Sequence, residues 1–122
     1  MKKIENKIML ITYPDSLGKD IPKLDNYLNQ YFKGLFGGVH ILPFYPCSGE
    51  RGFSGIDYDT VCSDFGSWED IDHLAEQYYL MADFMINHIS IRSREFRDYM
   101  EKGEASAFRD MFINWNEFWR AG

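Results

Sequence analysis

The sequence predicts an α/β fold in which three short parallel strands alternate with two helices. Three short apolar runs, at 7–12, 38–42 and 80–87, have the length and composition of strands. The stretches 21–33 and 68–78 between them carry apolar residues at helical spacing. This strand–helix–strand–helix–strand order requires right-handed crossover connections, and such connections join parallel strands.

Composition and charge indicate a globular protein and narrow the choice of partners. The 122 residues are enough for one modest domain or for a piece of a larger one. Hydrophobic residues make up 45% and aromatic residues 17%, which is ample for a packed core. The net charge of -6, with no basic tract, argues against nucleic acid and anionic membrane surfaces as partners.

Two further features favour a cytoplasmic protein. Cys47 and Cys62 are the only cysteines, and their spacing is not that of a metal site, so we interpret both as reduced thiols. The apolar run 8–11 is too short for a secretion signal and far too short to span a membrane. We therefore expect a cytoplasmic protein without a cysteine metal site.

The first strand and helix have clear local signals. The strand 7–12 ends at the turn-rich sequence 14–18, which contains a proline and a glycine. Asp20 is a suitable N-cap for the helix 21–33, and Pro22 falls in its first turn. The second strand, 38–42, begins at the second of two paired glycines and stops at a proline.

A long loop, 44–66, separates the second strand from the second helix. A loop of this length in a compact domain is usually functional or an insertion. Ser67 and Asp70 form a capping-box pattern at the start of the helix 68–78. Beyond the third strand, 89–102 is charged and predicted to be helical, with a closing glycine, and an aromatic-rich stretch follows it.

The third strand carries polar residues that a buried strand would normally avoid. Asp83 lies in its middle, and Asn87 and His88 lie at its end. A buried carboxylate is costly unless a neighbour binds it. The carboxyl end of a buried parallel strand is also where barrel and open α/β enzymes place their sites. The alternative is a capped strand with a satisfied core aspartate.

The segment 83–88 resembles the first conserved region of the α-amylase superfamily, glycoside hydrolase family 13. The segments 10–18, 37–44 and 49–53 are similar to sucrose phosphorylases, so that the match runs nearly end to end. The resemblance implies the first three β/α units of a TIM (β/α)₈ barrel, an incomplete barrel, since a complete one needs about 250 residues. It assigns 1–89 to the catalytic barrel and 90–122 to the start of the domain B insertion.

The resemblance also implies a reaction for the complete enzyme. Sucrose and phosphate would react by retaining double displacement to give α-glucose 1-phosphate and fructose, which makes the enzyme a hexosyltransferase. The nucleophile and the acid/base of this family lie on the fourth and fifth strands, so we expect no catalytic carboxylate among these residues. The resemblance implies neither a cofactor nor a metal, and its partners are sucrose and inorganic phosphate.

Three residues are implied to bind the substrate. His88 would contact the glucosyl 6-hydroxyl; the alternative is a capping or core histidine. Glu50 stands where the family usually has aspartate for the 4-hydroxyl, and its alternative is an ion pair with Arg51 on an exposed loop. Phe53 would form an aromatic wall of the sugar pocket or, alternatively, part of the core. We expect the three to converge at the carboxyl edge of the sheet.

Four more residues are assigned to framework or packing. The resemblance implies that Asp83 holds the site through an arginine on a later strand, which would leave it without that partner here. Asn87 would orient neighbouring groups. We expect Tyr13 and His40 to be packing residues on early strands.

Two other functions remain open. The first is a sister phosphorylase acting on sucrose 6'-phosphate or on glucosylglycerate, because the acceptor-side loops that would distinguish these substrates lie downstream. The second is a non-catalytic barrel fragment that pairs with another chain.

Overall fold

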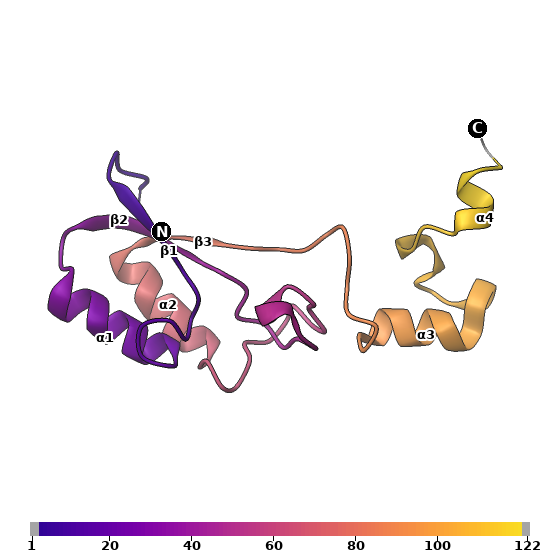
Figure 1. The fold of residues 1–122 in the computed structure, drawn as a ribbon, viewed down its shortest axis with the longest axis horizontal. Helices are drawn as coiled ribbons and strands as arrows, with labels where there is room; N and C mark the ends of the chain where they lie inside the picture. Colours follow the sequence, from indigo (N-terminus) through magenta and orange to yellow (C-terminus); the bar gives the residue numbers. More distant parts are fainter. Residues whose placement is uncertain (1–2, 121–122) are drawn as a thin grey trace.

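The structure, a computed structural model, describes residues 3–120 (Figure 1). Its strands and helices, in chain order, are β1 (Ile8–Thr12), α1 (Ile21–Tyr31), β2 (Phe36–Ile41), α2 (Trp68–Gln77), β3 (Tyr79–Ala82), α3 (Arg94–Lys102) and α4 (Trp115–Phe118). Short 3₁₀ turns lie at Glu50–Gly52, Gly103–Ala105 and Arg109–Met111.

The three strands form one parallel sheet in the order β1-β2-β3. Val39 in the central strand pairs with Leu10 on one side and with Leu80 on the other. Each pair of neighbouring strands is connected through a helix, so the prediction of an α/β fold with a parallel sheet is confirmed.

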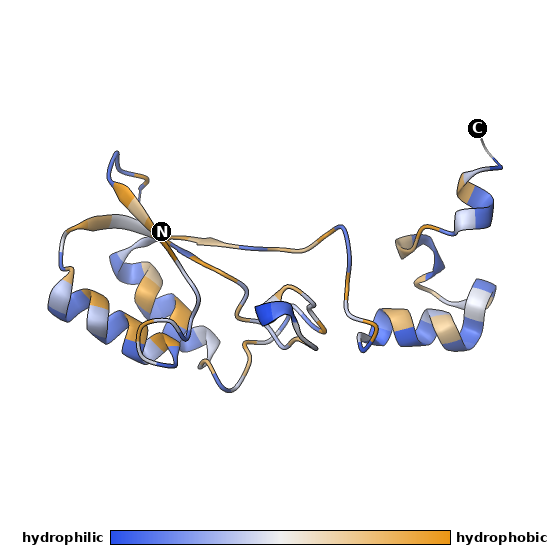
Figure 2. Ribbon diagram, in the orientation of Figure 1, coloured by the Kyte–Doolittle hydropathy of each residue, from blue (hydrophilic) through white to orange (hydrophobic). Residues whose placement is uncertain are grey.

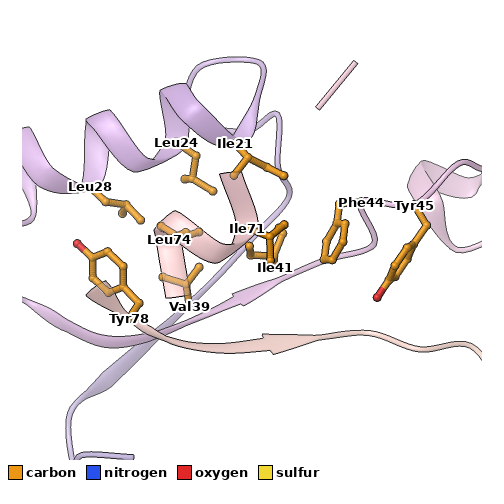
Figure 3. Packing of buried hydrophobic residues seen from close by; sticks show 10 residues of the cluster. All are labelled: Ile21, Leu24, Leu28, Val39, Ile41, Phe44, Tyr45, Ile71, Leu74 and Tyr78. Carbon is orange, nitrogen blue, oxygen red and sulfur yellow. The ribbon is translucent and has the colours of Figure 1, made fainter. Parts of the chain in front are cut away.

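The hydrophobic core lies between the sheet and the two helices α1 and α2, which both lie on one side of it (Figures 1 and 3). Leu10 and Leu80 pack against this core from the outer strands. Its buried members come from β2, the two helices and the segments that follow β2 and α2: Ile21, Leu24, Leu28, Val39, Ile41, Phe44, Tyr45, Ile71, Leu74 and Tyr78. The hydropathy of the elements agrees with this location of the core, since Figure 2 shows hydrophobic residues along the strands and a mixture of hydrophobic and hydrophilic residues along the helices.

The other side of the sheet is open. Because side chains alternate along a strand, the neighbours of Leu10, Val39 and Leu80 point away from the helices. Ile11 and Met81 on that side are 63% and 44% exposed. This side of the sheet, which we call the uncovered face, is where His40 also lies by the same alternation.

Local capping explains where the helices begin. The Asp20 side chain accepts a hydrogen bond from the backbone N–H of Lys23, as expected of the predicted N-cap. Ser67 and Asp70 form the predicted capping box of α2. The predicted helix 89–102 begins later, at Arg94, because the Ser93 side chain caps it by accepting from the N–H of Phe96.

The third strand is shorter than predicted, since it ends at Ala82 and not at residue 87. Ala82 pairs with Ile41, the last residue of β2, and Pro43 follows two residues later, with no backbone N–H to continue the ladder. Without a partner strand the apolar run continues as an extended chain outside the sheet. Asp83 therefore follows the strand and is not in its middle, and His88 lies well beyond its end.

The part after β3 extends away from the sheet (Figure 1). The chain runs through an extended stretch to α3 and α4, which lie far from α1. Phe112 packs there against Phe96 and Tyr99 of α3. Within residues 3–120, none of the helices combines the length and apolar character needed to cross a bilayer.

Candidate functional site

The candidate site lies beyond the carboxyl ends of β2 and β3, where two segments meet. One is the site loop, residues 47–58, from the long connection after β2; the other is the outgoing segment, residues 83–93, after β3. The Oγ atoms of Ser48 and Ser90 are 2.6 Å apart, and the buried Ser90 donates its backbone N–H to the Gly55 carbonyl at 2.8 Å. These contacts fix the outgoing segment against the site loop.

His88 and Phe53, two of the predicted substrate-binding residues, touch each other. The Nε2 of His88 lies 2.9 Å from the Phe53 carbonyl oxygen. A carbonyl oxygen only accepts, so Nε2 must carry the hydrogen and donate it. In the neutral imidazole this leaves Nδ1 as an acceptor, to which a sugar hydroxyl could donate. A donor role for His88 therefore requires a charged ring or release from Phe53.

Glu50 lies in the same turn as Phe53, whose N–H donates to the Glu50 carbonyl at 3.2 Å. The structure thus brings Glu50, Phe53 and His88 together, with Glu50 and His88 exposed and Phe53 half-buried. Their role in sugar binding stays a prediction. Asn87 is also exposed, next to His88.

The backbone of this turn is unusual. Glu50 and Arg51 both adopt left-handed conformations, with φ of 57° and 51°. Gly52 follows at φ 98°, and a Cβ built on it would lie 2.6 Å from the Pro43 carbonyl oxygen. Only glycine fits there, because the site loop approaches the end of β2 too closely for a side chain.

Arg51 contacts two residues of the segment that follows β1. Its guanidinium lies 2.9 Å from an Asp15 carboxylate oxygen and 3.9 Å from the centre of the Tyr13 ring. The ion pair of Arg51 is therefore with Asp15, and the alternative pairing with Glu50 is not observed. The sequence analysis missed Asp15, although the loops after β1 and β2 leave the same edge of the sheet.

Asp83 has a partner in this structure that the sequence analysis did not anticipate. Its Oδ2 lies 3.1 Å from the Nε2 of His40, and the two side chains are only 23% and 19% exposed. Burial raises the pKa of the nearby Tyr45 hydroxyl, and Tyr58 and the Asp83 carboxylate raise it further. His40, expected to be a packing residue, therefore forms a polar contact with Asp83, the predicted framework residue.

A cavity of about 800 Å³ lies elsewhere, between the site loop and α3. It is lined by Asp57 and Tyr58 from the loop and by charged residues of α3, among them Arg94 and Asp98. None of Glu50, Phe53 and His88 lines it. The predicted substrate-binding residues thus lie outside this cavity.

Comparisons with known proteins identify relatives over almost the whole chain. The sucrose phosphorylase of Streptococcus mutans is 57% identical over 116 residues, covering 95% of this chain and 24% of that protein. The sucrose 6(F)-phosphate phosphorylase of Thermoanaerobacterium thermosaccharolyticum is 47% identical, covering 98% and 24%. The glucosylglycerate phosphorylase of Escherichia coli is 41% identical, covering 89% and 20%. No family model matches the chain.

Solved structures give the same result for the fold. A sucrose 6F-phosphate phosphorylase from Thermoanaerobacter thermosaccharolyticum superposes with a TM-score of 0.91 at 46% identity, covering 95% of this chain and 24% of the other. An isomaltulose synthase from Erwinia rhapontici, at 24% identity, has a TM-score of 0.74 over 88% of this chain and 21% of its own, which concerns the fold alone. The chain spans about a quarter of the length of the relatives that it matches.

Proposed function

Since this chain is homologous over almost its whole length to sucrose phosphorylases, as its motifs predict, we propose that it supplies the first three β/α units of a (β/α)₈ barrel in such an enzyme. Residues 1–89 belong to this barrel, and 90–122 begin the domain B insertion; residues 1–2 and 121–122 lie outside the described part. The helices on one side of the sheet support this, because barrel helices form the outer ring.

The proposed reaction is transfer of glucose from sucrose to phosphate with retention, which gives α-glucose 1-phosphate and fructose. The observation that carries it is the contact between His88 and Phe53, with Glu50 in the same turn, beyond the carboxyl ends of β2 and β3. Barrel enzymes build their sites at this edge. A sugar ring there would meet an aromatic face, a carboxylate and an imidazole.

Each of these three side chains has a chemical role in the proposal. The Phe53 ring packs against the apolar face of the glucosyl ring. Glu50 accepts a hydrogen bond from the 4-hydroxyl, one methylene further from its backbone than the usual aspartate. His88 binds the 6-hydroxyl and stabilises the charge that develops in the transition state. Asp83 and Asn87 hold the chain around them.

The catalytic carboxylates are proposed to come from later strands of the complete barrel. Retaining transfer needs two carboxyl groups about 5 Å apart. Asp83 is bound to His40 and only partly accessible, and Glu50 stands on an exposed turn. Neither is suited to attack a sugar carbon.

Sister reactions on sucrose 6'-phosphate or glucosylglycerate are the second candidate. It is supported by the 47% identity to a sucrose 6(F)-phosphate phosphorylase and the 41% identity to a glucosylglycerate phosphorylase. A chain that pairs with a second polypeptide is the third, and the exposed Ile11 and Met81 support it because further strands would cover them. A cytoplasmic location is part of the proposal and is supported by the free thiols Cys47 and Cys62.

A chimera tests the proposal. The 122 residues replace the matching segment of the Streptococcus mutans enzyme, and a second chimera uses the sucrose 6(F)-phosphate phosphorylase in the same way. We expect the first to form glucose 1-phosphate from sucrose and phosphate, and the second to do so from the phosphorylated donor. A chimera that melts cooperatively but is inactive on every donor would refute the proposal.

His88 is examined in the same chimera. We expect His88→Ala to lower kcat about 100-fold with a smaller change in KM, because its contact strengthens in the transition state. His73→Ala, on the exposed side of α2, is the matched control. A raised KM with unchanged kcat would show that His88 serves ground-state binding only.

A further inference from the structure

His40 and Asp83 join two neighbouring strands at the edge where the candidate site begins. The parallel register pairs His40 with Met81, and Asp83 follows β3 by one residue after Ala82. Met81 and Asp83 lie on the same side of their strand by alternation, so both side chains of the pair point to the uncovered face. The hydrogen bond of 3.1 Å therefore crosses from β2 to the outgoing segment.

The pair is more enclosed than its apolar neighbours. The side chains of His40 and Asp83 are 19% and 23% exposed, whereas Ile11 and Met81 on the same face are 63% and 44% exposed. A carboxylate removed from water is costly unless a donor replaces that water. The imidazole of His40 is such a donor, and it binds Asp83 at the point where the chain leaves the sheet.

The geometry fixes which nitrogen acts. An ionised carboxylate only accepts hydrogen bonds, so the hydrogen lies on Nε2 of His40. Glutamine places its amide nitrogen as many bonds from Cα as Nε2 is, and can reach the same oxygen. Asparagine is one bond shorter and cannot reach it. Glutamine and asparagine thus carry the same amide donor, but only the glutamine side chain is long enough to bind Asp83.

The first part of the outgoing segment, residues 83–88, is thus held at both ends. The His40 bond to Asp83 fixes its start, and the His88 bond to Phe53 fixes the residue proposed to bind the sugar. The residues between have no strand partner in the described part of the chain. A shift at Asp83 would therefore pass along the chain to His88.

We propose that His40 is a positioning residue of the glucosyl transfer: its Nε2–H holds the Asp83 carboxylate and thereby sets the place of His88. This inference rests on the proposed function. A displacement of about 1 Å in a reacting group can lower turnover by about 100-fold. A purely structural pair, in contrast, would lower the melting temperature and leave the turnover of the folded enzyme unchanged.

The experiment compares His40→Gln with His40→Asn in the sucrose phosphorylase chimera. We expect His40→Asn to lower kcat at least tenfold with KM within threefold of the parent. His40→Gln should keep kcat within threefold. Equal kcat losses in the two variants, or no loss in His40→Asn, would overturn the inference. If His40→Asn does not fold, His40→Met takes its place as the variant without a donor.

The same comparison in an Asp83→Leu background, which offers His40 no acceptor, tests whether His40 acts through residue 83. We expect His40→Asn to cause no further loss of kcat there, and an additional tenfold loss would overturn the inference. An inactive parent chimera would instead refute the proposed function. The melting temperatures of the parent, His40→Asn, the residue-83 variant and the double variant then still test the underlying contact, because additive shifts would mean that the two side chains do not interact and would overturn the inference.

Discussion

At the scale of single residues, Arg51 stabilises a strained turn through contacts with residues that lie outside this turn. Two consecutive left-handed residues, Glu50 and Arg51, cost about 1–2 kcal/mol each. The stacking of Arg51 on Tyr13 contributes about 0.5–1 kcal/mol, and its exposed pair with Asp15 adds at most about 1 kcal/mol. These two contacts offset only part of the strain. The hydrogen bonds that close the turn between Ser48 and Ser54 offset the remaining strain.

Because the contacts of Arg51 offset part of this strain, their removal should loosen Glu50. We expect Arg51→Ala in the chimera to lower kcat/KM for sucrose about tenfold, with little change in melting temperature. Arg51→Lys should have a kcat/KM between those of the parent and Arg51→Ala, since an ammonium can pair with Asp15 but cannot stack on Tyr13 as the planar guanidinium does. Arg97→Ala, an exposed arginine of α3, is the control. An Arg51→Ala variant with the kcat/KM of the parent would contradict this role.

At the scale of elements, the closeness of the site loop to the end of β2 depends on Gly52. Gly52→Ala would combine a strained φ of 98° with a Cβ only 2.6 Å from the Pro43 carbonyl oxygen. Gly34 has a comparable φ of 78° but nothing within 4 Å of its added Cβ, so Gly34→Ala isolates the strain. We expect Gly34→Ala to destabilise the chimera by about 1 kcal/mol and Gly52→Ala by at least twice that, measured by denaturant unfolding. Equal losses would mean that the site loop moves freely away from Pro43.

The helix α3 should respond to acid through Asp98. Hydrogen bonds from the Lys102 ammonium and the Ser106 hydroxyl lower the pKa of this carboxyl below its usual range. Because its pKa is lower in the folded state, the ionised Asp98 carboxylate stabilises that state above the unfolded pKa of about 3.9. This stabilisation is lost as pH falls through the folded pKa. We expect amide-exchange protection at the end of α3 to fall over that acidic range and to be lower at neutral pH in Asp98→Asn. Protection in Asp98→Asn equal to the parent at neutral pH would contradict this.

Features encoded by near neighbours could be predicted from the sequence, and features that depend on distant partners could not. Asp20 and the Ser67–Asp70 box define helix starts locally, and the structure has them as predicted. The end of β3 depends on where β2 stops, which the apolar run through residue 87 does not reveal. The bond between His40 and Asp83 likewise depends on the register of two strands, which a single strand pattern does not contain.

At the scale of the whole molecule, one side of the sheet is packed and the other is not. Both helices cover the face of Leu10, Val39 and Leu80, while on the uncovered face Ile11 is 63% exposed and Met81 is 44% exposed. The edges of β1 and β3 are also unpaired within the described residues. Apolar surface and free strand edges of this kind promote association unless further strands cover them.

The isolated chain is therefore expected to be inactive and poorly stable. Asp83 is bound to His40 and Glu50 stands on an exposed turn, so we expect neither carboxyl group to serve in double displacement. Incubation of the purified 122 residues with sucrose and phosphate should yield no glucose 1-phosphate above a blank without protein. The same sample should bind a hydrophobic dye and associate as its concentration rises, which the chimera should not do. Turnover by the isolated chain that Glu50→Gln abolishes would place the chemistry on Glu50 and refute this account of the site.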